Sequence, residues 1–300
     1  MAKNKNKIRS KGMMIFDAVN VMIMLLLVVI ILVPVLSVVV NSFVSASEIA
    51  RRGVFILWPE DIDLGSYEYL WNCRSNIIRA YSNTLFRTIV GTFLSLTVTA
   101  LMAYSLSKRY LKGRISVNGL VFFTMLFSGG LIPGYMVVKL FGLIDSRWSL
   151  IIPGLVSAWN MFIMRNFFYA IPESLEEAAL IDGANQWQIF YRVTLPLSQA
   201  VLATIGLFYA VGHWNSWFDA MLYINSYEKL PMQNILRNII NSVSDLEGLG
   251  AEQYEMMDVK PASTSLRCAV IVVTATPIIV VYPFVQKYFV KGVMVGSVKG

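Results

Sequence analysis

Long runs of apolar residues without a charged side chain recur along the 300-residue chain. A membrane-spanning helix needs roughly 20 such residues, because each residue advances a helix by about 1.5 Å. The runs lack the alternation of polar and apolar positions typical of barrel strands. We therefore expect an all-α polytopic membrane protein with six transmembrane helices. The predicted spans are residues 18–40, 88–107, 115–138, 149–164, 194–218 and 268–286, the fourth being the shortest.

The composition supports a membrane protein, since 56% of the residues are hydrophobic and only 14% are charged. Soluble domains carry about 25% charged residues. The first apolar run follows five basic residues, as in a secretory signal, but it is longer than the roughly 7–15 apolar residues of a cleavable signal. We interpret it as a retained span, with cleavage near the small residues Ser45, Ala46 and Ser47 as the alternative.

Basic residues in the short connections predict the orientation of the chain. They precede the first span and cluster again between the second and third, and such residues favour the cytoplasmic side. Six spans then place both termini in the cytoplasm and most acidic residues outside. The net charge of +7 therefore reflects lysine and arginine on the inner side and does not indicate nucleic-acid binding.

The predicted organisation follows from these spans. The 80–288 core includes a cytoplasmic loop at 165–197 and an extracellular loop at 225–267. The predicted segments are a basic cytoplasmic N-terminus (1–14), a first transmembrane helix (15–42), an extracellular loop (43–79), a membrane-spanning core (80–288) and a cytoplasmic tail (289–300).

Catalytic chemistry finds little support in the residue inventory. His213 is the only histidine, so a Ser-His-Asp constellation could form only around it. The sequence has no phosphate-binding loop, no metal-ligand spacing, and no paired spacing between Cys73 and Cys268. We expect no enzyme activity, no disulfide framework and no cofactor in this chain.

The connection between spans four and five has explicit turn chemistry. Pro172 suits the first position of a helix, where its missing N–H costs nothing, and Glu173 and Glu176 would lie near the positive end of the helix dipole. Gly183 can adopt the left-handed conformation that ends a helix. We expect a helix at 172–181, followed by a turn.

A second short helix is predicted after this turn. Trp187, Phe190 and Tyr191 recur at i, i+3 and i+4, which would give it one aromatic face. Pro196 then opens span five, at a position where proline is tolerated. The two helices and the glycine between them form a predicted elbow.

The elbow carries a resemblance to a known family. Glu177-Ala178-Ala179, then Gly183 after three residues and Val193-Thr194-Leu195-Pro196 after nine more, resembles the EAA loop of importer-type ABC permeases, with Val193 in place of the usual isoleucine. The resemblance implies that the elbow seats in a groove of a separate ATPase subunit; an ordinary amphipathic surface helix is the alternative. The implied coupling residues are Glu177, Ala178, Ala179, Asp182, Gly183, Arg192, Leu195 and Pro196.

Four further segments are similar to the carbohydrate, maltose-type branch of this family, in particular to oligosaccharide permeases of Gram-positive bacteria. The likeness implies a type I importer permease fold in a bacterial cell membrane and a carbohydrate cargo, which the sequence does not specify further. The segments are 83–85, 127–134, 230–237 and 282–292.

The same resemblance implies several partners. They are a second homologous permease subunit, two ABC ATPase subunits that hold ATP and magnesium, and an extracellular solute-binding lipoprotein. The 225–267 loop would contact that lipoprotein, unless it is only a solvated loop. The tail with Lys299 would reach the ATPase, unless Lys299 only anchors the membrane edge.

Candidate substrate-path residues combine rings with polar groups, as a sugar requires. In span five, Tyr209, His213 and Trp217 recur at i, i+4 and i+8, flanked by Trp214 and Asn215. A membrane-interface belt of aromatic residues is the alternative.

Other candidates lie in spans two, three and four. Trp159 and Asn160 repeat the mixture of ring and polar group, and Arg87 could bind an acidic sugar, pair structurally or snorkel. A cluster of glycine and proline at 129–134 predicts a break in span three, which could serve transport or be a simple kink.

The sequence by itself leaves two other functions open. Importers of amino acids or metals share the EAA elbow, so a non-sugar cargo is possible. An ATP-independent secondary transporter is less favoured, because we find no internal repeat and few buried charges.

Overall fold

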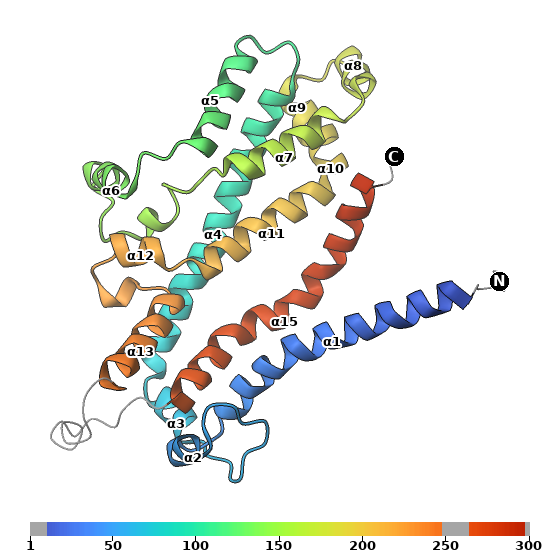
Figure 1. Ribbon diagram of the computed structural model, residues 1–300. Helices are drawn as coiled ribbons and strands as arrows, with labels where there is room; N and C mark the ends of the chain where they lie inside the picture. Colours follow the sequence, from blue (N-terminus) through green and yellow to red (C-terminus); the bar gives the residue numbers. More distant parts are fainter. Residues whose placement is uncertain (1–10, 248–263, 298–300) are drawn as a thin grey trace. The chain divides into compact units, whose positions relative to one another are not determined.

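The computed structural model describes residues 11–247 and 264–297, and within these ranges the secondary structure is helical, without strands (Figure 1). The basic N-terminal residues 1–10, the acidic residues within 248–263, and Lys299 lie outside the described residues. The chain divides into two compact units: 1–72 with 239–273, and 73–238 with 274–300.

The first unit contains α1 (Lys11–Asn41), α2 (Ala46–Arg52) and α3 (Gly65–Asn72). α1 is apolar on all sides and its side chains are mostly exposed within the chain, as expected of a helix surrounded by lipid or by another subunit. Ser45 caps α2 by accepting a hydrogen bond from the Glu48 N–H. Val44, Ile49 and Ile56 form a small core beside this helix.

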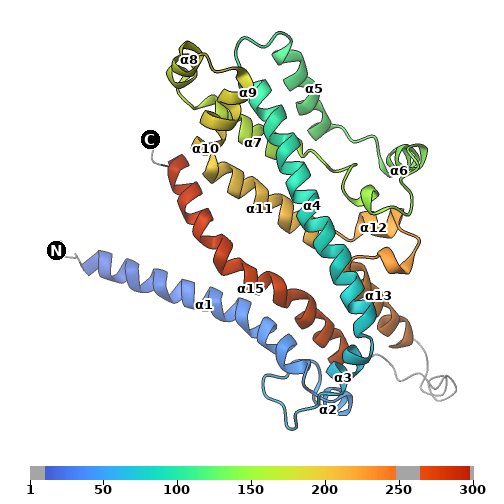
Figure 2. The same cartoon turned by 180° about the vertical axis from the view of Figure 1, so that it is seen from behind.

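The second unit is built around α4 (Arg74–Ser107), which packs along α7 (Ala158–Tyr169) and α11 (Gln199–Asn215) (Figures 1 and 2). Small residues let these helices approach closely: Ala100 and Ala103 of α4 are buried. At Gly91 a β-carbon would lie 2.7 Å from Nε2 of His213, so only glycine fits that crossing. The main core forms where the three helices meet. Its larger members are Tyr104, Leu106, Met161, Met164, Phe168, Phe190, Val201, Ile205 and Tyr209.

Further elements complete the two units. Two helices, α13 and α15, run across the boundary between the units. The elements are α5 (Arg114–Leu126), α6 (Leu131–Leu140), η1 (Arg147–Leu150), α8 (Glu173–Ile181), α9 (Gln186–Ile189), η2 (Phe190–Thr194), α10 (Leu195–Leu197), α12 (Phe218–Tyr223), η3 (Tyr227–Lys229), α13 (Met232–Glu247) and α15 (Thr264–Ser297).

The number of continuous spans differs from the sequence-based expectation. Among the described residues, two helices, α1 and α4, are long and apolar enough to cross a membrane, and up to four spans result if each of two bent helix pairs counts as one. The predicted span 149–164 is a 3-10 turn followed by the 12-residue α7, too short to cross alone. The prediction of a continuous span there was wrong.

Two predicted spans are interrupted. α5 and α6 meet at an angle of 118° around Gly130, which has φ +93°, so the predicted break in span three is present. The 186–197 segment and α11 meet at 83°, at Ser198. The predicted span 194–218 is therefore bent near its start, and its helix ends at Asn215.

Candidate functional site

The elbow begins with α8, whose bounds match the predicted helix to within one residue. Pro172 takes the capping position before the helix (φ −57°, ψ 128°) and not the first helical position. Gly183 has φ +83°, the left-handed conformation expected of it, and its N–H donates to the Leu180 carbonyl (3.0 Å). The N–H of the next residue, Ala184, donates to the Ala179 carbonyl (2.9 Å), which closes the turn.

α9 starts at once after this turn because Asn185 and Gln188 cap it reciprocally. The Asn185 side chain accepts from the Gln188 N–H (2.9 Å), and the Gln188 side chain accepts from the Asn185 N–H (2.8 Å). With both ends of the turn satisfied by hydrogen bonds, the elbow has a defined shape.

The predicted single aromatic face of the second elbow helix was wrong. Phe190 is buried, with its ring 4.8 Å from that of Tyr104, whereas Trp187 and Tyr191 are 70% and 72% exposed. The helix widens into a π-turn at Phe190–Thr194, and this turn lets the helix insert one ring into the core while it exposes the other two.

The elbow is tied to the end of α4 by two ion pairs that sequence reasoning missed. Lys108 pairs with Glu176, and both side chains are largely buried. Arg109 Nε lies 3.0 Å from Glu173 Oε1 in an exposed pair. The two glutamates therefore serve as partners for α4 in addition to lying near the start of α8. A cleft of about 310 Å³ lies beside these pairs, between the ends of α4 and α7 and helix α8.

The predicted coupling residues lie mostly on the surface of this elbow. Ala179 and Leu195 are half-buried, while the others are exposed, and Ile181 beside them is 86% exposed. The elbow thus presents an apolar and acidic surface on a fixed support. The exposed predicted residues are Glu177, Ala178, Asp182, Gly183, Arg192 and Pro196.

A second candidate region surrounds Arg87, whose side chain is 4% exposed. Its guanidinium pairs with the Asp219 carboxylate (Nη1 to Oδ1, 3.1 Å) and donates to the Ser216 carbonyl (3.2 Å). Of the possibilities weighed for Arg87, structural pairing is the one present in the chain. The pair connects α4 to the junction between α11 and α12.

The predicted ring stripe of span five divides. Tyr209 and His213 lie buried on α11, but Trp217 lies beyond the end of that helix, so the prediction of one continuous stripe was wrong. The Trp217 ring stacks under the guanidinium of Arg237 at 3.7 Å. The Tyr209 hydroxyl shares a hydrogen bond with Thr99 Oγ1 (2.7 Å) and accepts from the Ser157 N–H (2.9 Å).

The remaining path candidates differ in exposure. Trp214 and Asn160 are buried, while Asn215 and Trp159 are exposed. In the part of the chain that the structure describes, several buried polar atoms of α4 and α11 lack a hydrogen-bond partner, whereas most buried polar atoms in proteins have one. They include Arg87 Nε, Thr88 Oγ1, Thr92 Oγ1, Ser95 Oγ and His213 Nε2.

A third polar group fixes the loops at the other end of α4, and sequence reasoning did not predict it. Asn83 donates to the carbonyls of Glu228 (2.8 Å) and Leu230 (3.1 Å), and Thr84 Oγ1 accepts from the Met232 N–H (2.9 Å). In the sequence, residues 83–85 stand out only through the family resemblance.

Nearby, the Asp145 carboxylate gathers four hydrogen bonds and Asp145 itself adopts φ +58°. It accepts from Lys229 Nζ (2.8 Å), Ser226 Oγ (2.5 Å), and the N–H groups of Ser226 (2.9 Å) and Asn225 (3.1 Å). The lysine and the hydroxyl hold the pKa of this carboxyl well below its usual range.

Broken apolar helices and a projecting elbow define a polytopic membrane transport component. Residues 10–295 match the model of a family described as binding-protein-dependent transport system inner membrane component. The chain belongs to this family, and it is an inner membrane component of an ABC transport system.

Two relatives from Bacillus subtilis strain 168 match nearly end to end. Protein LplC is 42% identical over 300 residues, which cover 100% of both chains. The polygalacturonan/rhamnogalacturonan transport system permease protein YtcP is 43% identical over 286 residues, 95% of this chain and 99% of that one.

A solved structure has the same fold. It is the crystal structure of a bacterial ABC transporter involved in the import of the acidic polysaccharide alginate. The matching chain is 34% identical, with a TM-score of 0.83 over 95% of this chain and 100% of that chain.

Proposed function

We propose that this chain is the permease subunit of an ATP-driven carbohydrate importer, with an oligosaccharide as cargo. Support comes from its full-length similarity to a permease named for polygalacturonan and rhamnogalacturonan transport and to an importer of alginate. It would form half of the pathway, the other half coming from a second, homologous permease. A solute-binding lipoprotein would deliver the cargo on one side, and two ATPase subunits would bind on the other.

The proposed topology has six spans with both termini in the cytoplasm. In it, the bent pairs α5–α6 and α10–α11 each make one span, α7 with the turns before it makes the fourth, and α15 the sixth. A helix may break inside a membrane where neighbouring helices or a cavity satisfy its backbone. In this topology the elbow and the basic residues at 108–114, between α4 and α5, both face the cytoplasm.

The elbow is the coupling element in this proposal, and its geometry is the observation that carries it. Exposed Ile181 and Trp187 would enter the ATPase groove, while the Lys108–Glu176 pair would pass the motion to α4. Because the turn is hydrogen-bonded on both sides of Gly183, the elbow can keep its shape while the ATPase subunit moves it.

Substitution of Gly183 tests this coupling. A β-carbon at Gly183 would meet no atom within 4 Å, so any effect must come from the backbone at φ +83°. Gly183→Val should abolish cargo-stimulated ATP hydrolysis by the reconstituted complex, because a β-branched residue is strained there. Gly183→Asn is the matched control, since asparagine tolerates this conformation. Stimulation that survives in Gly183→Val would contradict the coupling role.

The cargo is tested separately. The purified complex in proteoliposomes should accumulate labelled oligosaccharides only with its binding protein and internal ATP. The panel should include alginate and polygalacturonate fragments beside neutral glucans. Uptake of amino acids but of no saccharide would overturn the carbohydrate assignment, and accumulation without the ATPase would favour a secondary transporter.

A further inference from the structure

A short loop that follows α2 exposes several large apolar side chains. Phe55 is 66% exposed and Trp58 is 81% exposed, and Val54 and Leu57 beside them are exposed as well. We call residues 54–58 the apolar loop. Its fifth member, Ile56, is buried in the small core with Val44 and Ile49, so the loop is anchored while its other side chains point outward.

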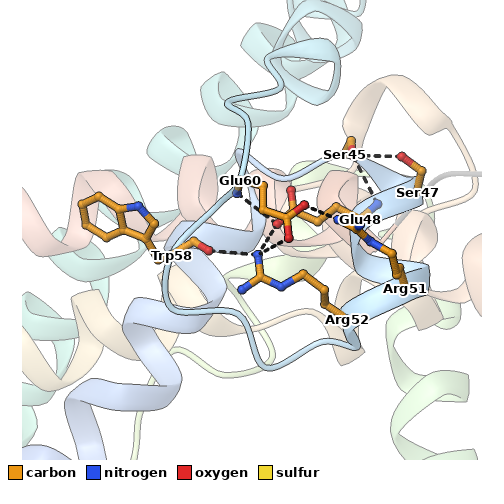
Figure 3. Close-up of polar contacts among 7 residues, drawn as sticks. All are labelled: Ser45, Ser47, Glu48, Arg51, Arg52, Trp58 and Glu60. Atoms are coloured by element: carbon orange, nitrogen blue, oxygen red, sulfur yellow. Dashed lines mark hydrogen bonds and ion pairs between the residues drawn. The ribbon is translucent and has the colours of Figure 1, made fainter.

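Polar contacts hold the apolar loop in this shape (Figure 3). The buried Glu48 carboxylate accepts from Arg52 Nη1 (2.6 Å) and from the Glu60 N–H (3.1 Å). Arg52 also donates to the Trp58 carbonyl (3.3 Å), and Figure 3 shows the Trp58 indole directed away from these ion pairs. These contacts therefore hold Trp58 in its exposed position.

Two hydrogen bonds fix the position of the apolar loop along α1. The Val54 carbonyl accepts from Asn41 Nδ2 (2.5 Å) and from Ser37 Oγ (3.3 Å), and both donors lie in the last turns of α1. The chain thus folds back beside the end of the apolar helix. At that same end α1 exposes Val35, Leu36 and Val39.

We propose that the apolar loop is a lipid anchor: Phe55, Leu57 and Trp58 insert into the headgroup region of the bilayer where α1 leaves the membrane. Tryptophan concentrates at this depth because its ring is largely apolar and its N–H needs a polar partner. The loop lies beside the end of a helix that is exposed to its surroundings over most of its length. The inference rests on membrane insertion of α1 and not on the identity of the cargo.

The charges nearby fit the same position. Arg51 and Arg52 lie one turn from the loop. Arg51 pairs with Glu60, and Arg52 pairs with Glu48 and Glu60, so two carboxylates balance the two arginines near the apolar surface. A docking site for a soluble protein would offer unpaired charges or hydrogen-bonding groups around its apolar centre. Here the exposed centre is apolar, and the two arginines and Glu60 beside it are paired within the chain.

Spin labels at single cysteines test the anchor. Cys73 and Cys268 are first replaced by serine and alanine, and the full complex is placed in nanodiscs of phosphatidylglycerol and phosphatidylethanolamine. Phe55→Cys and Trp58→Cys are compared with Asp61→Cys, an exposed residue of the same loop region that carries a charge. Power saturation measures collisions of each label with oxygen, which enters lipid, and with a water-soluble nickel chelate.

The anchor predicts an oxygen-to-nickel collision ratio severalfold higher at positions 55 and 58 than at position 61. Equal ratios at all three positions would place the loop in water and overturn the proposal. Labels at 55 and 58 shielded from both reagents would mean that a protein subunit covers the loop, which also overturns it. A lipid-like ratio that turns to shielding only when binding protein is added would assign the surface to that partner instead.

Discussion

Arg87 and Asp219 form an ion pair across the interior of the second unit, with Nη1 of the arginine 3.1 Å from Oδ1 of the aspartate. Asp219 also accepts from the Ser216 hydroxyl and the Ala220 N–H, both at 2.9 Å. The pair thereby fixes the junction at which α11 ends and α12 begins. A charge inside a membrane protein needs such a partner, since an unpaired one is costly.

Arg87→Met should therefore destabilise the protein strongly, by about 3 kcal/mol, because it leaves the Asp219 carboxylate partly buried without its counter-charge. Unfolding of the purified protein in mixed micelles, followed by circular dichroism as denaturing detergent is added, measures the change.

The matched control for this pair is the double variant Arg87→Met/Asp219→Leu. Replacement of both charges by apolar side chains should restore much of the loss. A double variant that is as unstable as Arg87→Met alone would show that the pair is not what Arg87 contributes.

Gly91→Ala should force α4 and α11 apart, because the new β-carbon would lie 2.7 Å from His213 Nε2. We expect a loss of about 1–3 kcal/mol, typical of overpacking. His213→Ala in the same chain should recover part of it, which a double-mutant cycle measures. Gly212→Ala in α11 is the control: nothing lies within 4 Å of its β-carbon, so the unfolding free energy should not fall. Equal losses for both glycines would contradict the contact.

The two ion pairs that join the elbow to α4 should differ in their effect on cargo-stimulated ATP hydrolysis. Lys108→Glu places two acidic groups together at a largely buried site, and it should reduce cargo-stimulated ATP hydrolysis severalfold. Lys108→Glu/Glu176→Lys should restore the attraction and the stimulation. Arg109→Glu disturbs the exposed pair with Glu173, which contributes at most about 1 kcal/mol, and the exposed contact of the guanidinium with the Tyr169 ring, and it should have little effect. A larger effect of Arg109→Glu than of Lys108→Glu would contradict this ranking.

Asp145 should make the loops around it sensitive to acid. Lys229 and Ser226 lower the pKa of this carboxyl in the folded protein, so its stabilising effect is present above the ordinary aspartate pKa of about 3.9. That effect is lost as the pH falls toward the depressed folded value. Stability should therefore decline below about pH 4 through this group.

Lys229→Met provides the comparison for Asp145. The difference in melting temperature between wild type and Lys229→Met should be constant from about pH 5 to 8 and should shrink in stronger acid, as the carboxyl gains its proton. A difference that grows in acid would show that the sign of the pKa shift is wrong.

The elbow was the part of the site most open to prediction from sequence. Gly183 has the conformation expected of it, and α8 begins within one residue of its predicted start. Both features depend on turn chemistry that acts over a few neighbouring residues. The aromatic face failed at Phe190, because burial against Tyr104 decided the direction of that ring and the π-turn changed the spacing.

Long apolar runs and turn residues by themselves determined the helical membrane class of this chain and the presence of an elbow, because those signals are local. The sequence also predicted the break in span three, but the tertiary structure alone decided the bend at Ser198, which rings are buried, and which charges meet. Arg87 and Asp219 are 132 positions apart, and only the packing of α4 along α11 brings them together. Pairing over that separation depends on the whole chain being folded, and no short pattern of residues records it.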